Sequence, residues 1–209
     1  MPVREDARAG RVHLILAVAA AALFFVLCLI VDADEIDPWE VDVTRWINDA
    51  PAWLDEVLWP IMQLGTFWAP IVIAIAAAYV WGIRRALAVL ASGVAAWFLA
   101  KVVKDAIERG RPPRYIPDID VREGSGAGLG FVSGHTAVAF AIATALLPVL
   151  PRWGRVTAYA LATVVGVARL VYGVHFPLDV VGGACLGIMC GCVVELVLLA
   201  VPASRAPAG

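Results

Sequence analysis

Apolar segments about as long as a lipid bilayer is thick recur along the whole of this 209-residue sequence. A helix that crosses a bilayer needs about 20 consecutive, mostly apolar residues. Hydrophobic residues make up 62% of the chain and charged residues 16%. Soluble domains have about 45–50% apolar and about 25% charged residues. The sequence therefore predicts an integral membrane protein.

Six segments have the length and apolar character of a spanning helix, or nearly so: 12–31, 63–81, 86–103, 136–150, 156–172 and 178–201. We therefore predict an all-α fold, an integral membrane bundle of six transmembrane helices, in a single domain over residues 1–209. The fourth and fifth segments are short, which suits helices whose ends open onto a polar pocket. Residues 1–11 are expected to be a cytoplasmic tail. The apolar run after them exceeds the core of a signal peptide, about 7–15 residues, and is predicted to be a retained anchor.

The connection 32–62 between the first two segments is rich in tryptophan. Trp39, Trp46, Trp53 and Trp59 alternate there with acidic residues. Tryptophan favours the headgroup region of a bilayer, and an amphipathic helix can lie in the plane of the interface. We predict an interfacial amphipathic helix in this segment, with an ordinary packed loop as the alternative.

The lysine and arginine residues do not decide the orientation by number. Six spans divide the 16 basic residues into eight on each side. One side carries small clusters in tails and in the short turns 82–85 and 151–155, as topology signals do. Most of the other set lies between Lys101 and Arg122. We therefore predict a plasma (inner) membrane protein with both termini cytoplasmic and the second set facing outward.

Three short motifs contain the side chains best suited to chemistry, and six spans bring all three to the same side of the membrane. They are Lys104-x6-Arg111-Pro112, Ser133-Gly134-His135 and Arg169-x5-His175-x3-Asp179. Fixed charge beside apolar segments is costly unless it has a function. We expect the segments 104–135 and 169–179 to form an active site.

The cations of these motifs are suited to a phosphate group. Phosphoryl transfer spreads negative charge over the equatorial oxygens, and Lys104, Arg111 and Arg169 can supply the opposite charge. Ser133 and Gly134 directly precede an apolar helix, with serine as a favoured N-cap. The N–H groups at the start of a helix bind anions. These five residues are the candidate phosphate-binding residues.

The two histidines supply a nucleophile and an acid. A neutral imidazole can attack phosphorus and form a phosphohistidine, and a second histidine can protonate the leaving oxygen. Asp179 follows His175 by four residues and can accept the ring N–H that fixes its tautomer. We assign His175 as the nucleophile, His135 as the general acid and then the base for water, and Asp179 as the orienting carboxylate. Pro177 suits the first turn of the last helix.

Each of these residues has a structural alternative: Lys104 and Arg111 as interfacial anchors, His135 as a helix cap, and Arg169 as the partner of Asp179. A zinc site made of the two histidines and the aspartate is disfavoured, because three nearby cations would repel the ion. The four cysteines lie inside apolar runs and are expected to be small buried hydrophobes. We therefore predict no metal and no cofactor. The joint pattern favours phosphate chemistry over the separate structural roles.

In order and spacing, the three motifs resemble the signature of the type 2 phosphatidic acid phosphatase superfamily over residues 104–179. The resemblance implies a helical membrane bundle, metal-independent hydrolysis through phosphohistidine, and lipid phosphates or diphosphates as substrates. It implies the same roles for the matching residues, with Ser133 and the Gly134 backbone in contact with the phosphate.

Two positions depart from the family pattern. Val132 stands where proline is common, and Ala168 stands where the third motif usually begins with serine. Replacing serine by alanine removes one hydroxyl, and a neutral hydrogen bond contributes about 0.5–1.5 kcal/mol. We expect the missing hydroxyl to affect the rate and the substrate rather than the chemistry.

The favoured function is a membrane lipid phosphatase acting on an isoprenoid diphosphate or a glycerophospholipid phosphate. A phosphotransferase that uses the same phosphohistidine is the alternative. A non-catalytic lipid-binding or transport module is a more distant one, suggested only by Glu195 within the last apolar segment. The expected partners are the lipid substrate and the membrane. The net charge of −2 gives no reason to expect nucleic acid. The oligomeric state is not predicted.

Overall fold

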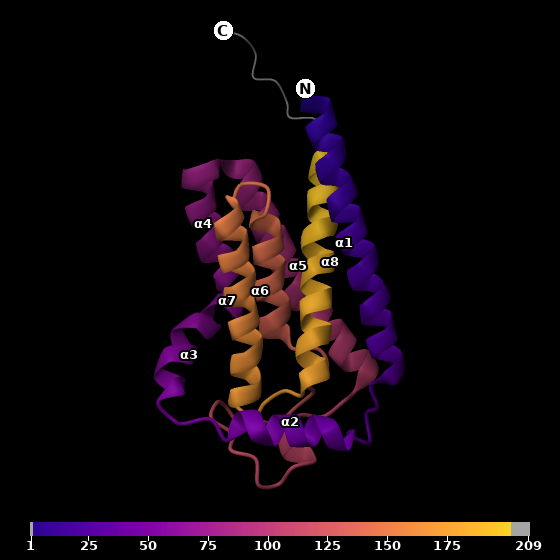
Figure 1. Ribbon diagram of the computed structural model, residues 1–209, viewed down its shortest axis with the longest axis vertical. Helices are drawn as coiled ribbons and strands as arrows, with labels where there is room; N and C mark the ends of the chain where they lie inside the picture. The colour runs from indigo at the N-terminus through magenta and orange to yellow at the C-terminus, as the bar shows by residue number, and fades with distance from the viewer. Residues whose placement is uncertain (1, 202–209) are drawn as a thin grey trace.

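A computed structural model describes residues 2–201, with side chains from residue 9 onward. Six helices run along the bundle: α1 (Pro2–Ile30), α4 (Ala69–Trp81), α5 (Ile83–Ile107), α6 (Gly134–Leu146), α7 (Arg152–Val171) and α8 (Pro177–Ala200). Two more, α2 (Pro38–Asn48) and α3 (Leu54–Met62), lie toward one end (Figure 1). This arrangement confirms the all-α membrane bundle. Residues 2–11, expected to be part of a cytoplasmic tail, are helical and continue into α1, and their place outside the membrane stays a prediction.

Four of these helices are long and apolar enough to cross a bilayer: Ala9–Ile30, α5, α7 and α8. The segment Leu54–Gly65 and α4 would form a fifth span if they are counted together. The 13 residues of α6 extend only about 20 Å, against a hydrocarbon core of about 30 Å. The count of six spans therefore stays a prediction.

The second apolar segment, 63–81, was predicted to be one spanning helix but is divided into two elements. It consists of the short 3₁₀ turn η1 (Gln63–Gly65) and α4, and the axis bends by 72° between Leu54–Gly65 and α4. Gly65 lies against the start of α6, since a Cβ built there would be 2.5 Å from the His135 carbonyl oxygen. The bend therefore brings this segment against the helix that carries the second motif.

Helix α8 packs closely against α6 because its contact face consists of glycine. At Gly183 an added Cβ would lie 2.5 Å from the Ser133 carbonyl oxygen, and at Gly191 it would lie 2.5 Å from Thr144 Cβ. Gly187 lies between them at the same four-residue spacing and faces the Ala137 carbonyl oxygen. Small residues at this spacing let helix backbones approach. The beginnings of α6 and α8 are thereby held side by side.

Helix α2 lies across the end of the bundle (Figure 1), so the segment 32–62 contains a helix, as predicted; its place at the membrane interface stays a prediction. The segment also contains α3, so it forms two helices. The four tryptophans of this segment are exposed by 47–78%, as expected for side chains that meet headgroups. The buried face of α2 is polar, with Glu40, Thr44 and Asn48 at four-residue spacing. The helix therefore presents aromatic rings outward and polar groups to the protein.

The opposite end of the bundle holds both ends of the described chain. Gly10 of α1 lies beside Leu199 of α8, since a Cβ on Gly10 would be 3.8 Å from its Cδ1 atom. Glu195 forms an ion pair with Arg85 there. This buried carboxylate is thus held by a helix partner, which gives no support to a transport pathway. The four cysteines are free thiols, three of them buried.

Candidate active site

The three motifs meet at the end of the bundle that α2 covers. Lys104 lies in the last turn of α5, Arg111 in the loop after it, Ser133 and His135 at the start of α6, Arg169 in the last turn of α7, and Asp179 in the first turn of α8. His175 lies in the turn between α7 and α8. Four helix ends therefore supply the side chains, so the bundle itself determines where each is placed.

His175 and Asp179 form a buried hydrogen bond. Nδ1 of His175 lies 3.2 Å from Oδ2 of Asp179, which also accepts the backbone N–H of Phe176 at 2.9 Å. The helix begins at Pro177, as predicted, so the aspartate both caps α8 and reaches back to the imidazole. A carboxylate can only accept, so Nδ1 carries the proton and Nε2 keeps its lone pair. This tautomer is the one that a nucleophilic histidine needs.

The surroundings of His175 favour the neutral ring. The side chain is 2% exposed. Burial, with the positive charges of Lys104, Arg169 and Arg111, holds the pKa of His175 well below its ordinary value of 6.5. The unprotonated imidazole is therefore the form present at neutral pH. The same three charges show that cations of the first and third motifs lie close to the histidine.

The first motif is tied to the loop that leads into the second. Lys104 Nζ donates to the carbonyl oxygens of Leu129 and Gly130 at 2.6 and 2.8 Å, and Arg111 Nε donates to Leu129 at 3.3 Å. A Cβ on Gly130 would lie 2.9 Å from Asp179 Oδ2, so this close approach requires glycine. The loop thus brings both cations toward the start of α6.

The second motif forms the start of α6, where an anion site was predicted. Ser133 is the N-cap residue, but its side chain makes no capping bond, contrary to expectation; its Oγ accepts from Thr136 Oγ1 at 2.9 Å. The Ser133 N–H donates to the Asp179 carbonyl oxygen at 2.9 Å. A Cβ on Gly134 would meet only Ala100 Cβ, at 3.9 Å. His135 follows, half-buried and within electrostatic reach of His175 and the motif cations.

Arg169 is buried but does not pair with Asp179, which was its structural alternative. Its NH1 group forms an ion pair with Glu123 and lies 2.9 Å from the Met62 sulfur. Asp179 is instead paired with Arg109, whose NH1 lies 3.0 Å from Oδ1. Arg169, which was predicted to bind phosphate, is therefore paired with an acidic side chain of the loop 115–133, Glu123.

Three charged residues of this site were not predicted from the sequence: Glu40, Arg109 and Glu123. Arg109 and Glu40 form a buried ion pair, and their side chains are each 1% exposed. Burial raises the pKa of the Glu40 carboxyl, and the charge of Arg109 acts against that rise. The polar spacing of Glu40, Thr44 and Asn48 was the available signal, because it marks a face of α2 that turns inward.

The two departures from the family pattern lie in packed surroundings. Val132 and Ala168 are both 0% exposed. Ala168 belongs to an apolar cluster with Leu58, Met62 and Val171. The position predicted to lack a hydroxyl is therefore enclosed by hydrocarbon.

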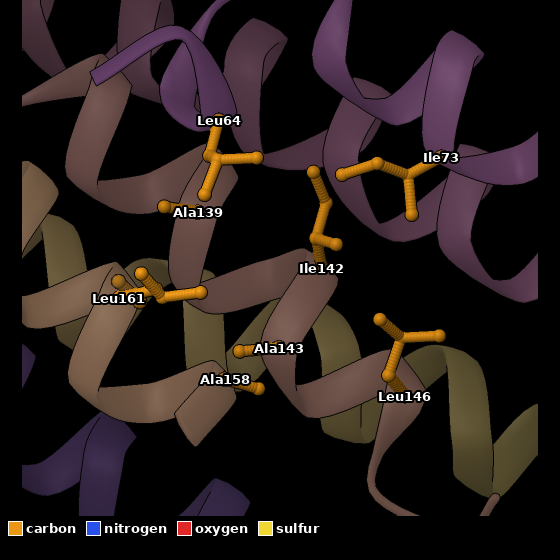
Figure 2. A pocket seen from close by; sticks show the side chains of 9 residues that line it. Leu64, Ile73, Ala139, Ile142, Ala143, Leu146, Ala158 and Leu161 are labelled. Atoms are coloured by element: carbon orange, nitrogen blue, oxygen red, sulfur yellow. The ribbon is translucent and has the colours of Figure 1, made fainter. Parts of the chain in front are cut away.

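An apolar cavity of about 130 Å³ lies between α4, α6 and α7 (Figure 2). Its lining is entirely hydrophobic: Leu64, Ile73, Ala139, Ile142, Ala143, Leu146, Ala158, Leu161 and Ala162. Ala139 and Ala143 follow His135 at four-residue intervals, so all three lie on one face of α6. The cavity therefore begins about one helical turn from the candidate acid.

The apolar helical bundle defines an integral membrane protein. The histidines, cations and carboxylate at one end of it form a site suited to phosphate esters. Residues 83–200 match the family model described as the PAP2 superfamily. The chain belongs to this superfamily, whose members are membrane lipid phosphatases. The family assignment that the three motifs suggested is thereby confirmed.

Individual relatives agree with this assignment. Phosphatidylglycerophosphatase B of Bacillus subtilis is 33% identical over 152 residues, which cover 66% of this chain and 71% of that protein. Undecaprenyl-diphosphatase of Sulfolobus acidocaldarius is 31% identical over 96 residues, 46% of this chain and 47% of that protein. The chain thus spans about half the length of this second relative.

Two solved structures share the fold. The crystal structure of Aquifex aeolicus LpxE has a TM-score of 0.66 and 26% identity, covering 79% of this chain and 98% of that one. The first transmembrane PAP2-type phosphatidylglycerolphosphate phosphatase from Bacillus subtilis has a TM-score of 0.75 and 24% identity, covering 90% and 98%.

Proposed function

We propose that this chain hydrolyses a lipid phosphate or diphosphate through a phosphohistidine formed on His175. The observation that carries the proposal is the buried hydrogen bond between His175 Nδ1 and Asp179, which leaves Nε2 as a nucleophile among three cations. Membership of a phosphatase family supports the reaction class.

The substrate phosphate would be held by charge and by the start of α6. Lys104, Arg111 and Arg169 oppose the negative charge that develops on the equatorial oxygens. Ser133 and the free backbone approach at Gly134 offer hydrogen-bond donors at a helix N-terminus. Because these side chains can supply the positive charge that the reaction requires, we propose that it needs neither a metal ion nor a cofactor.

The reaction would take two steps. His175 Nε2 attacks phosphorus, the bond from phosphorus to the lipid oxygen breaks, and His135 gives its proton to that oxygen. His135 then takes a proton from water, whose oxygen attacks the phosphohistidine, and inorganic phosphate leaves while Nε2 regains its lone pair. Asp179 stabilises the positive imidazole of the intermediate.

The substrate we propose is an isoprenoid diphosphate or a glycerophospholipid phosphate. The names of the two sequence relatives support these two classes. The apolar cavity beside His135 would receive part of the lipid chain. We further propose six passes through the plasma membrane with both termini cytoplasmic and the site outside. This topology is supported by the two ends of the described chain, which lie at the end opposite α2 (Figure 1).

The test is phosphate release by the purified full chain in detergent with EDTA present. Undecaprenyl diphosphate, phosphatidylglycerol phosphate and phosphatidate are compared, with His175→Asn as the control. We expect release from at least one substrate and none by the variant. Activity that is lost with EDTA and restored by a divalent ion would contradict the metal-free reaction. If phosphate were transferred only to an added alcohol and none were released, the chain would be a phosphotransferase and not a hydrolase.

A further inference from the structure

A chain of buried charges leads from the interfacial helix to the candidate nucleophile. Arg109 donates through NH2 to Glu40 Oε2 and through NH1 to Asp179 Oδ1 at 3.0 Å, and Asp179 Oδ2 meets His175 Nδ1 at 3.2 Å. None of these four side chains is more than 2% exposed. One cation therefore lies between two carboxylates, and only the second carboxylate touches the histidine.

Such an arrangement costs free energy unless every member is well paired, because burying a charge removes its hydration. Here the pairing is extensive, although Arg109 Nε has no hydrogen-bond partner among the described residues. Glu40 Oε1 also accepts the Leu178 backbone N–H at 3.0 Å, and the Arg109 guanidinium carbon lies 4.9 Å from the Phe176 ring centroid. The Arg109 carbonyl oxygen accepts the Gly130 N–H at 2.7 Å. Arg109 thus joins α2, the start of α8 and the loop before the second motif.

We propose that Arg109 and Glu40 are positioning residues for the reaction at His175, an inference that rests on the proposed phosphatase function. Arg109 holds the Asp179 carboxylate by Oδ1, turned so that Oδ2 faces the imidazole. Glu40, from the interfacial helix, holds the guanidinium in the orientation that allows this. Neither residue touches the phosphate.

The position of the guanidinium distinguishes it from the candidate phosphate clamps. Both terminal nitrogens of Arg109 are engaged by carboxylates, one on each side. Lys104 and Arg111 instead donate hydrogen bonds to backbone carbonyl oxygens of the Leu129–Gly130 loop. These carbonyl groups carry no net charge, so the positive charge of both side chains is not neutralised by them. Loss of Arg109 should therefore impair formation of the phosphohistidine while leaving the binding of phosphate intact.

The experiment compares Arg109→Ala, Arg109→Lys and Glu40→Gln with the wild-type full chain in detergent. We expect kcat to fall by about 10–100-fold for Arg109→Ala and by less for the other two, as for residues that orient a catalytic group. The KM and the inhibition constant for inorganic phosphate should change by less than about threefold. A loss of 1.4 kcal/mol in phosphate binding would instead change the inhibition constant tenfold. Added guanidinium ion should restore part of the rate of Arg109→Ala. The matched control is Arg45→Gln, which removes a cation from an exposed ion pair on α2, the helix of Glu40. This variant should keep the wild-type rate.

A purely structural role is tested by the double variant Glu40→Leu/Arg109→Met, which removes both charges together. We expect its thermal unfolding to stay close to wild type and its kcat to remain low. Full activity in the double variant would overturn the proposal. So would a rise in the phosphate inhibition constant of Arg109→Lys as large as that of Arg111→Gln, because Arg109 would then bind substrate. Wild-type turnover is measured first, so a failure of the phosphatase assignment is seen before these comparisons begin.

Discussion

Asp179 holds the imidazole of His175 from the first turn of the helix that follows it, with Oδ2 3.2 Å from Nδ1. The same oxygen accepts the Phe176 N–H, so the carboxylate cannot turn away without uncapping α8. One side chain therefore both caps α8 and contacts the proposed nucleophile. The tautomer of the nucleophile is determined by how a helix begins.

Replacing Asp179 by asparagine should lower kcat by between about 10² and 10⁴, because an amide can present a donor to Nδ1 and favour the wrong tautomer. The KM should change little. Steady-state kinetics of the purified variant measure this, with the exposed Asp118→Asn as the control. A loss of less than threefold would show that the carboxylate does not orient the nucleophile.

Replacing His135 by alanine should slow the release of a poor leaving group by about 10²–10⁴-fold, the usual contribution of general acid catalysis. With an aryl phosphate, whose leaving oxygen needs no proton, the first step should approach the wild-type rate. The measurement is a burst of aryl alcohol followed by a slow steady rate, because water still lacks its base. Equal losses for alkyl and aryl substrates would contradict the role as acid.

Glu123 should compete with phosphate for Arg169. Their ion pair joins a guanidinium that is 4% exposed to a carboxylate that is 38% exposed, so an arriving phosphate must displace or share it. Glu123→Gln should tighten inhibition by inorganic phosphate by about threefold to tenfold, tenfold being 1.4 kcal/mol. Glu56→Gln serves as the control. Weaker phosphate binding in Glu123→Gln would mean that the carboxylate orients Arg169 instead of blocking it.

The apolar cavity should contribute to recognition of the lipid chain. Ala143→Leu places three more carbon atoms in a space of about 130 Å³ on the face of α6 that carries His135. We expect kcat/KM to fall for a long-chain lipid phosphate and to stay near wild type for a short, water-soluble one. The exposed Val156→Leu on α7 is the control. Equal effects on both substrates would argue that the cavity has no contact with the chain.

The motif residues were predictable because each depends on local order along the chain. The spacing of four between His175 and Asp179 and the proline at the start of α8 determine their contact without reference to the rest of the fold. The long apolar helices were equally predictable, since hydropathy alone identifies a helix that faces lipid. The resemblance to the superfamily followed from the same short motifs.

The remaining features depend on contacts between distant parts of the chain. Glu40 and Arg109 are 69 residues apart, and nothing in the sequence pairs them. Glu123 reaches Arg169 across 46 residues from a glycine-rich loop whose path the sequence leaves open. The bend before α4 was missed because an apolar window records composition and not direction. The inward polar face of α2 has a four-residue spacing, but its partners come from other helices.

The proposed mechanism transfers the phosphoryl group of the substrate to His175. It is tested most directly by mixing enzyme with substrate labelled on the scissile phosphate, quenching in alkali within milliseconds, and mapping the labelled peptide. Phosphohistidine is expected on the peptide that contains His175, stable to base and lost in acid, and absent from His175→Asn. More of it should accumulate in His135→Ala with the aryl phosphate, because water is then activated slowly. Turnover without any enzyme-bound phosphate in that variant, or label on a different residue, would contradict the mechanism.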